Sequence, residues 1–228
     1  MARCRPATFA PPPDSITRRF EVAHTPLDIG GRHYELLRPR SVDDLISEED
    51  FAIDERLPYW ADCWPSSLVL AQHLAAFTGN GRSLLELGCG VGLVSLVAAA
   101  CRFSVLATDY DASALEFTAA NASRHHFSSI DTRRVDWRRL PDDLGCFDVV
   151  IASDVLYERP QAELVAATLA RTLAPGGMGL IADPGRRTAA PFAEQCRRHA
   201  LACRCAHQAA IIDGQAELTI SVFEIHRI

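Results

Sequence analysis

The segment LELGCGVGL at 85–93 restricts the fold of this chain more than any other feature. The apolar residues at 83–87 predict a buried strand, and the apolar run at 91–101 predicts a helix. Three glycines at alternate positions allow the backbone between them to turn sharply and to approach a ligand closely. The N–H groups that open the following helix point to the same place. A strand, a glycine turn and a helix in this order are typical of a parallel α/β sheet with a ligand site at its carboxyl edge.

The remainder of the chain repeats this alternation of strand and helix. We expect strands at 104–108, 130–135, 147–152 and 178–182, a turn at 175–177, and helices at 111–125, 161–173 and 190–202. Connections of this length give right-handed crossovers and a mostly parallel sheet. The last two strands, 209–212 and 218–225, are separated by a short turn and must pair antiparallel at one edge. The pattern therefore predicts a doubly wound, Rossmann-like α/β sheet of seven strands with an antiparallel edge strand.

Three regions are expected along the chain. Residues 1–17 predict a flexible, proline-rich tail, and 18–56 predict an N-terminal β-hairpin extension that turns at Gly30-Gly31. The acidic stretch at 43–55 is typical of a solvated surface segment. Residues 57–228 then form the α/β domain, in which Pro65 suits the first turn of a helix that covers 68–77.

Composition excludes several functions. All 23 basic residues are arginines, so a P-loop lysine, a pyridoxal Schiff base and any lysine nucleophile are absent. The formal net charge of -6 argues against binding nucleic acid through bulk electrostatics. No apolar run approaches the ~18 residues that cross a bilayer, so no membrane association is expected. The eight cysteines lack the spacing of a disulfide framework and the start of the chain lacks a secretory apolar region, which together favour a reducing, cytoplasmic location.

Two acids beside the glycine turn indicate which ligand it receives. Asp109 ends the second strand, 21 residues after Gly88, where a carboxylate can accept both hydroxyls of a ribose. Glu86 precedes Gly88 by two residues and would repel a pyrophosphate, whereas it would favour an ammonium or a sulfonium. S-adenosylmethionine carries both cations and a ribose. The third glycine also arrives one residue too early for the G-x-G-x-x-G pattern of dinucleotide sites.

At this point the chain resembles the class I, seven-strand S-adenosylmethionine-dependent methyltransferases, whose first motif reads E-x-G-x-G-x-G. It is most similar to the group that contains the protein-lysine methyltransferases and their bacterial relatives. YWADCWPS at 59–66 is similar to their Y-W-A-x-x-W-P-S element, and SDVLY at 153–157 matches their D-x-x-Y motif. ADPGR at 182–186 is similar to the G-D-P-G-R segment of the methyltransferases that act on the electron-transfer flavoprotein beta subunit, with Ala182 where glycine is usual.

This resemblance, taken with the glycine turn and its two acids, implies a set of site residues. The residues expected to hold the cofactor are Trp60, Trp64, Glu86, Gly88, Gly90, Gly92, Asp109, Asp136, Trp137 and Ser153. Within it, the two tryptophans at 60 and 64 would flank the cofactor, and Asp136 with Trp137 would border its adenine. The implied partner is a protein that presents a lysine side chain, with neither nucleic acid nor membrane involved.

Two further residues are the candidates for catalysis. Asp154 follows the fourth strand at the edge where ligands bind, so its carboxylate can orient an incoming amine. Tyr157 can add a hydroxyl or an aromatic wall for a cation. Methyl transfer requires a neutral amine held near the methyl group with water excluded. Val155-Leu156 differs from the N/D-P-P-Y/F slot of enzymes that methylate bases or glutamine, which demotes those acceptors.

Other assignments remain open. A small-molecule amine is the main alternative acceptor on the same fold, whereas a nicotinamide-dependent oxidoreductase and a non-catalytic nucleoside-binding module are alternatives of other classes. No metal site is expected, because the cysteines and histidines at 196–207 lack a paired C-x₂-C knuckle. They are more typical of packed thiols with a surface histidine. Oligomeric state, the acceptor and the number of methyl groups added do not follow from the sequence.

Overall fold

A seven-stranded sheet forms the centre of the molecule in the computed structural model, which describes residues 13–42, 45, 57–214 and 216–228. Its order is β5-β4-β3-β6-β7-β9-β8. The strands are β3 (Ser83–Leu87), β4 (Ser104–Asp109), β5 (Ile130–Arg134), β6 (Phe147–Ser153), β7 (Leu173–Asp183), β8 (Leu201–Asp213) and β9 (Ala216–Arg227). β3 to β7 pair in parallel, and β9 runs antiparallel between β7 and β8. The predicted doubly wound sheet with an antiparallel edge is confirmed.

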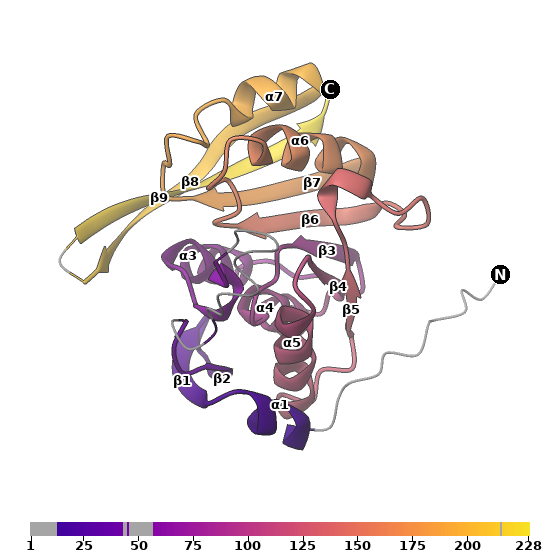
Figure 1. Ribbon diagram of the computed structural model, residues 1–228. Helices are drawn as coiled ribbons and strands as arrows, with labels where there is room; N and C mark the ends of the chain where they lie inside the picture. The colour runs from indigo at the N-terminus through magenta and orange to yellow at the C-terminus, as the bar shows by residue number, and fades with distance from the viewer. Residues whose placement is uncertain (1–12, 43–44, 46–56, 215) are drawn as a thin grey trace.

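Helices cover both faces of this sheet (Figure 1). α3 (Pro65–Leu74), α4 (Leu93–Ala100) and α5 (Ala112–Arg124) lie on one face, and α6 (Gln161–Thr172) and α7 (Phe192–Arg198) lie on the other. Successive strand residues point to opposite faces. In β3, Leu84 therefore joins the core under the first set of helices, whereas Leu85 joins the core under the second. Burial on both faces explains why this strand is apolar throughout.

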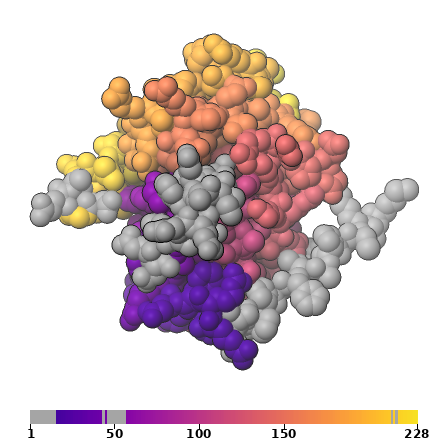
Figure 2. All heavy atoms as spheres, viewed as in Figure 1, coloured from indigo at the N-terminus to yellow at the C-terminus, as the bar shows by residue number. Residues whose placement is uncertain are grey.

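The N-terminal segment forms the predicted hairpin from β1 (Val22–Ile29) and β2 (Arg32–Pro39). Gly30 and Gly31 both have positive φ, at 57° and 75°, as the two central residues of a tight hairpin turn require. Figure 2 shows this indigo segment at one end of the molecule and the orange and yellow C-terminal part at the other. Contacts of β1 with α3 and of β2 with α5 attach the hairpin to the main domain.

The end of the expected tail is ordered. Helix α1 spans Pro13–Arg19, and its Ile16 is fully buried in the same core as the hairpin. A proline at the first helical position is favourable because its missing N–H would have no helical partner there. The predicted flexible tail therefore cannot extend to residue 17. Residues 1–12, and the acidic stretch at 43–55 apart from Leu45, lie outside the described residues.

The C-terminal third differs from expectation in two places. The helix predicted at 190–202 is shorter, because Ala200 takes a positive φ of 55° and β8 begins at Leu201 rather than at 209. Alanine and cysteine, which suit either element, concealed the alternation of burial that starts at Leu201. The turn predicted at 175–177 instead lies within β7, beside an irregularity in its pairing with β6.

A buried asparagine joins three elements that are distant in sequence. The side-chain amide of Asn121, on α5, donates to the carbonyls of Leu37 on β2 and Val91 beside the glycine turn, both at 2.8 Å. Its carbonyl oxygen accepts the N–H of Leu37, also at 2.8 Å. Asn121 is fully buried, so each of these backbone groups depends on it for a partner.

Asn121→Ala is therefore expected to lower the free energy of unfolding by about 2–4 kcal/mol, because it leaves three buried backbone groups without partners. Urea denaturation followed by circular dichroism measures this loss. Ser123→Ala, at an exposed position of the same helix, is the matched control and should change stability by less than about 0.5 kcal/mol. Equal stability of the two variants would contradict the role given to Asn121.

Candidate cofactor and acceptor site

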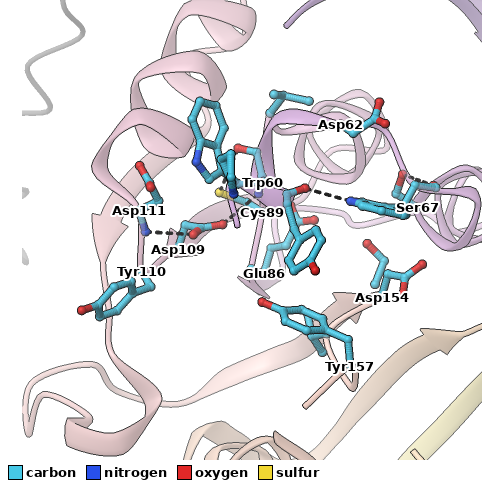
Figure 3. Close-up of a pocket in the computed structure, with 18 of the residues that line it drawn as sticks. Trp60, Asp62, Ser67, Glu86, Cys89, Asp109, Tyr110, Asp111, Asp154 and Tyr157 are labelled. Atoms are coloured by element: carbon cyan, nitrogen blue, oxygen red, sulfur yellow. Dashed lines mark hydrogen bonds between the residues drawn. The ribbon is translucent and has the colours of Figure 1, made fainter. Parts of the chain in front are cut away.

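A pocket of about 790 Å³ opens at the carboxyl ends of the parallel strands. Its walls come from the segments that follow β3, β4, β5 and β6, together with η2 (Tyr59–Ala61) and the start of α3. Figure 3 shows Asp109 and Tyr110 at one end, Asp154 and Tyr157 at the other, and Glu86 between them. The volume is in the range of small-molecule and cofactor sites.

The glycine turn forms the floor of the pocket. A Cβ at Gly90, whose φ is +53°, would lie 2.9 Å from the backbone oxygen of Trp60, so two stretches of main chain meet there. A Cβ at Gly92, whose φ is +90°, would lie 2.8 Å from Oγ1 of Thr118. Both positions therefore require glycine. Gly88 and Gly90 line the pocket, but Gly92 does not, since it faces Thr118 and precedes α4. That Gly92 helps to hold the cofactor stays a prediction, and in this structure its position supports the turn rather than the pocket wall.

Asp109 supports the turn as well as lining the pocket. Its Oδ2 accepts the N–H of Gly90 at 3.0 Å, and its Oδ1 accepts the N–H of Asp111 at 3.0 Å. Burial raises its pKa to about 6, and these backbone hydrogen bonds oppose the rise. Each carboxylate oxygen has a second lone pair that a ribose hydroxyl can use. The position is therefore compatible with the predicted ribose contact.

Glu86 is a buried acid at the centre of the pocket floor. It is 1% exposed and accepts a hydrogen bond from the hydroxyl of Ser95 on α4. Burial raises its pKa to about 8, the hydrogen bond from Ser95 opposes the rise, and the charge of Asp109 adds to it. A cation bound in the pocket would compensate both acids.

Aromatic side chains border the cofactor half of the pocket. Trp137 follows β5 and lines the pocket near Gly88, while Asp136 accepts hydrogen bonds from the backbone and guanidinium of Arg138. Tyr110, which was not predicted from the sequence, follows Asp109 directly and also lines the pocket. The guanidinium carbon of Arg138 lies 5.4 Å from the centroid of the Tyr110 ring. The position of Tyr110 directly after Asp109 is the sequence signal from which it could have been predicted.

The two predicted tryptophans have different surroundings. Trp60 lines the pocket and packs against Phe20 and Phe117, so it belongs to the core as much as to the site. Trp64 lines the pocket at the start of α3, and its indole N–H donates to the carbonyl of Tyr59 at 2.8 Å. The bond fixes the orientation of the indole ring at the pocket wall.

Asp154 is held by residues from two other segments. Its Oδ1 accepts Nε of Arg186 at 2.8 Å and Nη2 at 2.6 Å, and its Oδ2 accepts the hydroxyl of Ser66 at 2.9 Å. Its side chain is 4% exposed, and its φ of +56° places it in the left-handed region. Such a conformation is tolerated by aspartate and turns the chain out of β6 beside Ser153, which also lines the pocket.

Tyr157 completes an aromatic wall around this acid. Its ring lies 5.3 Å from that of Tyr59, which in turn lies 5.9 Å from that of Trp64, both with edge-to-face geometry. Arg186 and Ser66 were not predicted as site residues. Both stand in the segments that carry the family resemblance, at 182–186 and 59–66, and this was the available signal.

The pocket attracts cations. Seven carboxyl side chains line it, namely Asp62, Glu86, Asp109, Asp111, Asp136, Asp154 and Glu158, against two arginines, Arg19 and Arg138. Both arginines already pair with acids, Arg19 with Glu116 and Arg138 with Asp136. A ligand that carries a sulfonium and an ammonium fits this set, whereas a diphosphate does not.

Neither a metal cluster nor a membrane span is found among the described residues. No three histidine, cysteine, aspartate or glutamate side chains in that part of the chain lie close enough to hold an ion. Its cysteines are free, with Cys196 buried and Cys205 exposed. None of the described helices combines the length and the apolarity needed to cross a membrane.

The effect of Glu86→Gln on the stability of the ligand-free protein, measured against the native protein, should be more favourable at pH 7–8 than at pH 5. The glutamate keeps its proton to about pH 8 when folded but loses it near pH 4.5 when unfolded, so folding binds a proton in this interval. Stability of the native protein therefore falls as the pH rises from about 4.5 to 8, and the amide removes this contribution. Thermal denaturation at pH 5 and pH 8 measures the difference. Glu217→Gln, at an exposed position on β9, should leave the pH dependence unchanged.

Comparison with known proteins identifies a methyltransferase domain in the part of the chain that forms the glycine turn. Residues 84–177 match the family described as a methyltransferase domain. The chain is 29% identical over 148 residues to the histone-arginine methyltransferase METTL23 of Xenopus laevis, covering 62% of this chain and 63% of that protein. It is 31% identical over 136 residues to the electron transfer flavoprotein beta subunit lysine methyltransferase of Danio rerio, covering 57% of this chain and 51% of that protein. The chain thus spans between half and two thirds of these relatives.

Solved structures share the fold at low sequence identity. A precorrin-6y C5,15-methyltransferase from Geobacter metallireducens has a TM-score of 0.57 at 15% identity and covers 71% of this chain and 87% of its own. Coclaurine N-methyltransferase with bound N-methylheliamine and SAH has a TM-score of 0.55 at 10% identity, covering 71% of this chain and 70% of its own. The [4+2]-cyclase SpnF has a TM-score of 0.57 at 17% identity, covering 70% and 80%.

The fold, the glycine turn with its two acids and the sequence matches agree with one another. The expectation drawn from the 85–93 segment is confirmed at the level of family and cofactor. Residues 84–177 match a methyltransferase domain, and the matches together support a class I S-adenosylmethionine-dependent methyltransferase related to the protein-lysine methyltransferases, with S-adenosylmethionine as the cofactor.

Proposed function

We propose that this protein is an N-methyltransferase whose acceptor is the lysine side chain of another protein. One observation carries the proposal. The nearly buried carboxylate of Asp154 lies beside the aromatic side chains of Tyr59 and Tyr157, at the end of the pocket opposite Asp109. The cofactor acids and the proposed acceptor acid thus line opposite ends of one continuous pocket.

In this proposal the chain positions two reactants and excludes water. The glycine turn, Asp109 and Trp137 would hold the nucleoside, and Glu86 would compensate the cationic part of the cofactor. S-adenosylmethionine held there would supply an electrophilic methyl group, with the electron pair of the broken C–S bond remaining on a neutral sulfur. Asp154 accepts an N–H of the neutral acceptor amine, and Tyr157 shields it from solvent. The proton that the acceptor ammonium loses beforehand passes to water.

The relatives support a protein acceptor. They include a lysine methyltransferase of the electron transfer flavoprotein beta subunit and protein-lysine methyltransferases of the METTL21 group. The segment at 153–157 lacks the paired prolines that shape a slot for a base or a glutamine amide. A small-molecule amine is the alternative outcome of the experiment below, and the cyclase with the same fold shows that fold alone does not define a reaction.

Asp154→Asn is expected to reduce methyl transfer by about 100-fold or more, because the acceptor nitrogen loses its charged anchor. Its affinity for S-adenosylhomocysteine should stay within about threefold of the native value. The assay uses S-adenosylmethionine with a tritiated methyl group and a cell lysate, followed by separation of proteins from small molecules. Since the chain contains no lysine, every methyllysine detected belongs to an acceptor.

Asp142→Asn is the matched control, because Asp142 is a fully exposed acid that pairs only with Arg171 among the described contacts. It should retain full activity. Label found only in small molecules would replace the protein acceptor by a small amine. Loss of S-adenosylhomocysteine binding in Asp154→Asn would remove Asp154 from the acceptor role and assign it to the cofactor.

A further inference from the structure

The contacts of Asp154 leave a restricted set of directions for an acceptor. Arg186 places two N–H groups on the same oxygen, Oδ1, while the hydroxyl of Ser66 occupies one side of Oδ2. Both oxygens therefore already have a partner from the chain itself. A single further donor can still reach the carboxylate, but a pair of parallel donors cannot span both oxygens without displacing one of these partners.

Arg186 is held in this place from several sides. The loop after β7 that carries it is fixed by Asp183, whose Oδ1 accepts the backbone N–H groups of Gly185 at 2.7 Å and of Arg186 at 2.9 Å. Asp183 is fully buried. The guanidinium of Arg186 lies 5.9 Å from the ring centroid of Trp64, so it lies close to both the indole and the carboxylate.

The ion pair also changes the charge that an acceptor meets. A lone carboxylate at this site would stabilise a bound cation and so would favour the protonated, non-nucleophilic form of a lysine. Arg186 offsets that charge at contact distance. An amine bound beside a neutral ion pair loses its proton more readily, while still donating one hydrogen bond to Asp154.

A guanidinium meets the opposite conditions. It remains charged at any accessible pH and is recognised best through two parallel N–H groups on both oxygens of a carboxylate. Here Arg186 and Ser66 take those places, and a second cation would face Arg186 across the same acid. The contacts of Asp154 therefore separate two acceptor classes that both occur in the names of the relatives, lysine and arginine.

We propose that Arg186 is a specificity-determining residue: by pairing with Asp154 it makes the acceptor end of the pocket bind an amine and reject a guanidinium. The proposal rests on the function proposed above, in that it takes Asp154 as the acceptor contact. It goes beyond that function by naming the group that separates the two classes. Arg186 acts through Asp154 and is in this sense a positioning residue.

The test measures binding of two side-chain analogues to the full chain saturated with S-adenosylhomocysteine. NMR titrations near pH 10, where part of the amine is neutral and the guanidine stays charged, compare n-butylamine with n-propylguanidine. The native protein should bind the amine at least about fivefold more tightly. Arg186→Gln should lose or reverse this preference, because Asp154 then presents a free oxygen and an uncompensated charge.

Arg187→Gln is the matched control, since Arg187 is the exposed neighbour in the same loop. It should keep the native preference. Arg186→Lys, which keeps the positive charge, should also keep a preference for the amine. If Arg186→Gln does not fold, Arg186→Met provides the same comparison with an apolar side chain of similar length beside Trp64.

An unchanged ratio of the two affinities in Arg186→Gln or Arg186→Met would overturn the proposal. So would a native protein that binds the guanidine as well as the amine, or that binds neither. Failure of the proposed function is distinguishable from this: native protein that methylates no amine in the lysate assay, yet shows an Arg186-dependent preference in the titration, would refute the function and leave the binding rule intact.

Discussion

The left-handed turn between β3 and α4 is the constraint on which the rest of this structure depends. Asp109 accepts the N–H of Gly90, the Thr118 hydroxyl donates to the Gly90 carbonyl at 2.9 Å, and the Asn121 amide donates to the Val91 carbonyl. These three partners come from β4 and α5, and Asn121 extends the connection to the N-terminal hairpin. A side chain at Gly90 would collide with the main chain of Trp60. The floor of the cofactor site and the attachment of the hairpin are therefore one unit.

This arrangement carries a cost in stability. Glu86 and Asp109 lie close to each other under the turn, and burial raises the pKa of both. Neither acid is needed to complete the core, since Leu85 and Leu87 on the same strand are fully buried apolar side chains. Acids whose charged form the fold penalises are expected where a cationic ligand provides the compensation. The ligand-free molecule thus gives up stability that binding restores.

The acceptor half is built on a different principle. Its members come from three segments far apart in sequence: Ser66 at the start of α3, Asp154 after β6, and Arg186 after β7. The carboxyl ends of parallel strands meet at one edge, which brings two of these segments together, and the order of the sheet places β6 beside β7. Neighbouring structures with the same fold carry out different reactions, so function in this class depends on such local contacts more than on the sheet.

Local pattern was sufficient for the sheet, the hairpin and most of the pocket. Alternating strands and helices, the glycine spacing and the position of Asp109 are properties of neighbouring residues, and they predicted the family that the sequence matches support. The pattern was insufficient at 199–208, where alanine and cysteine suit either a helix or a strand. It also could not reveal that Asp154 already holds Arg186, because no periodicity relates residues 32 positions apart. Only the packing of β6 against β7 decides that contact, and with it the charge that an acceptor meets.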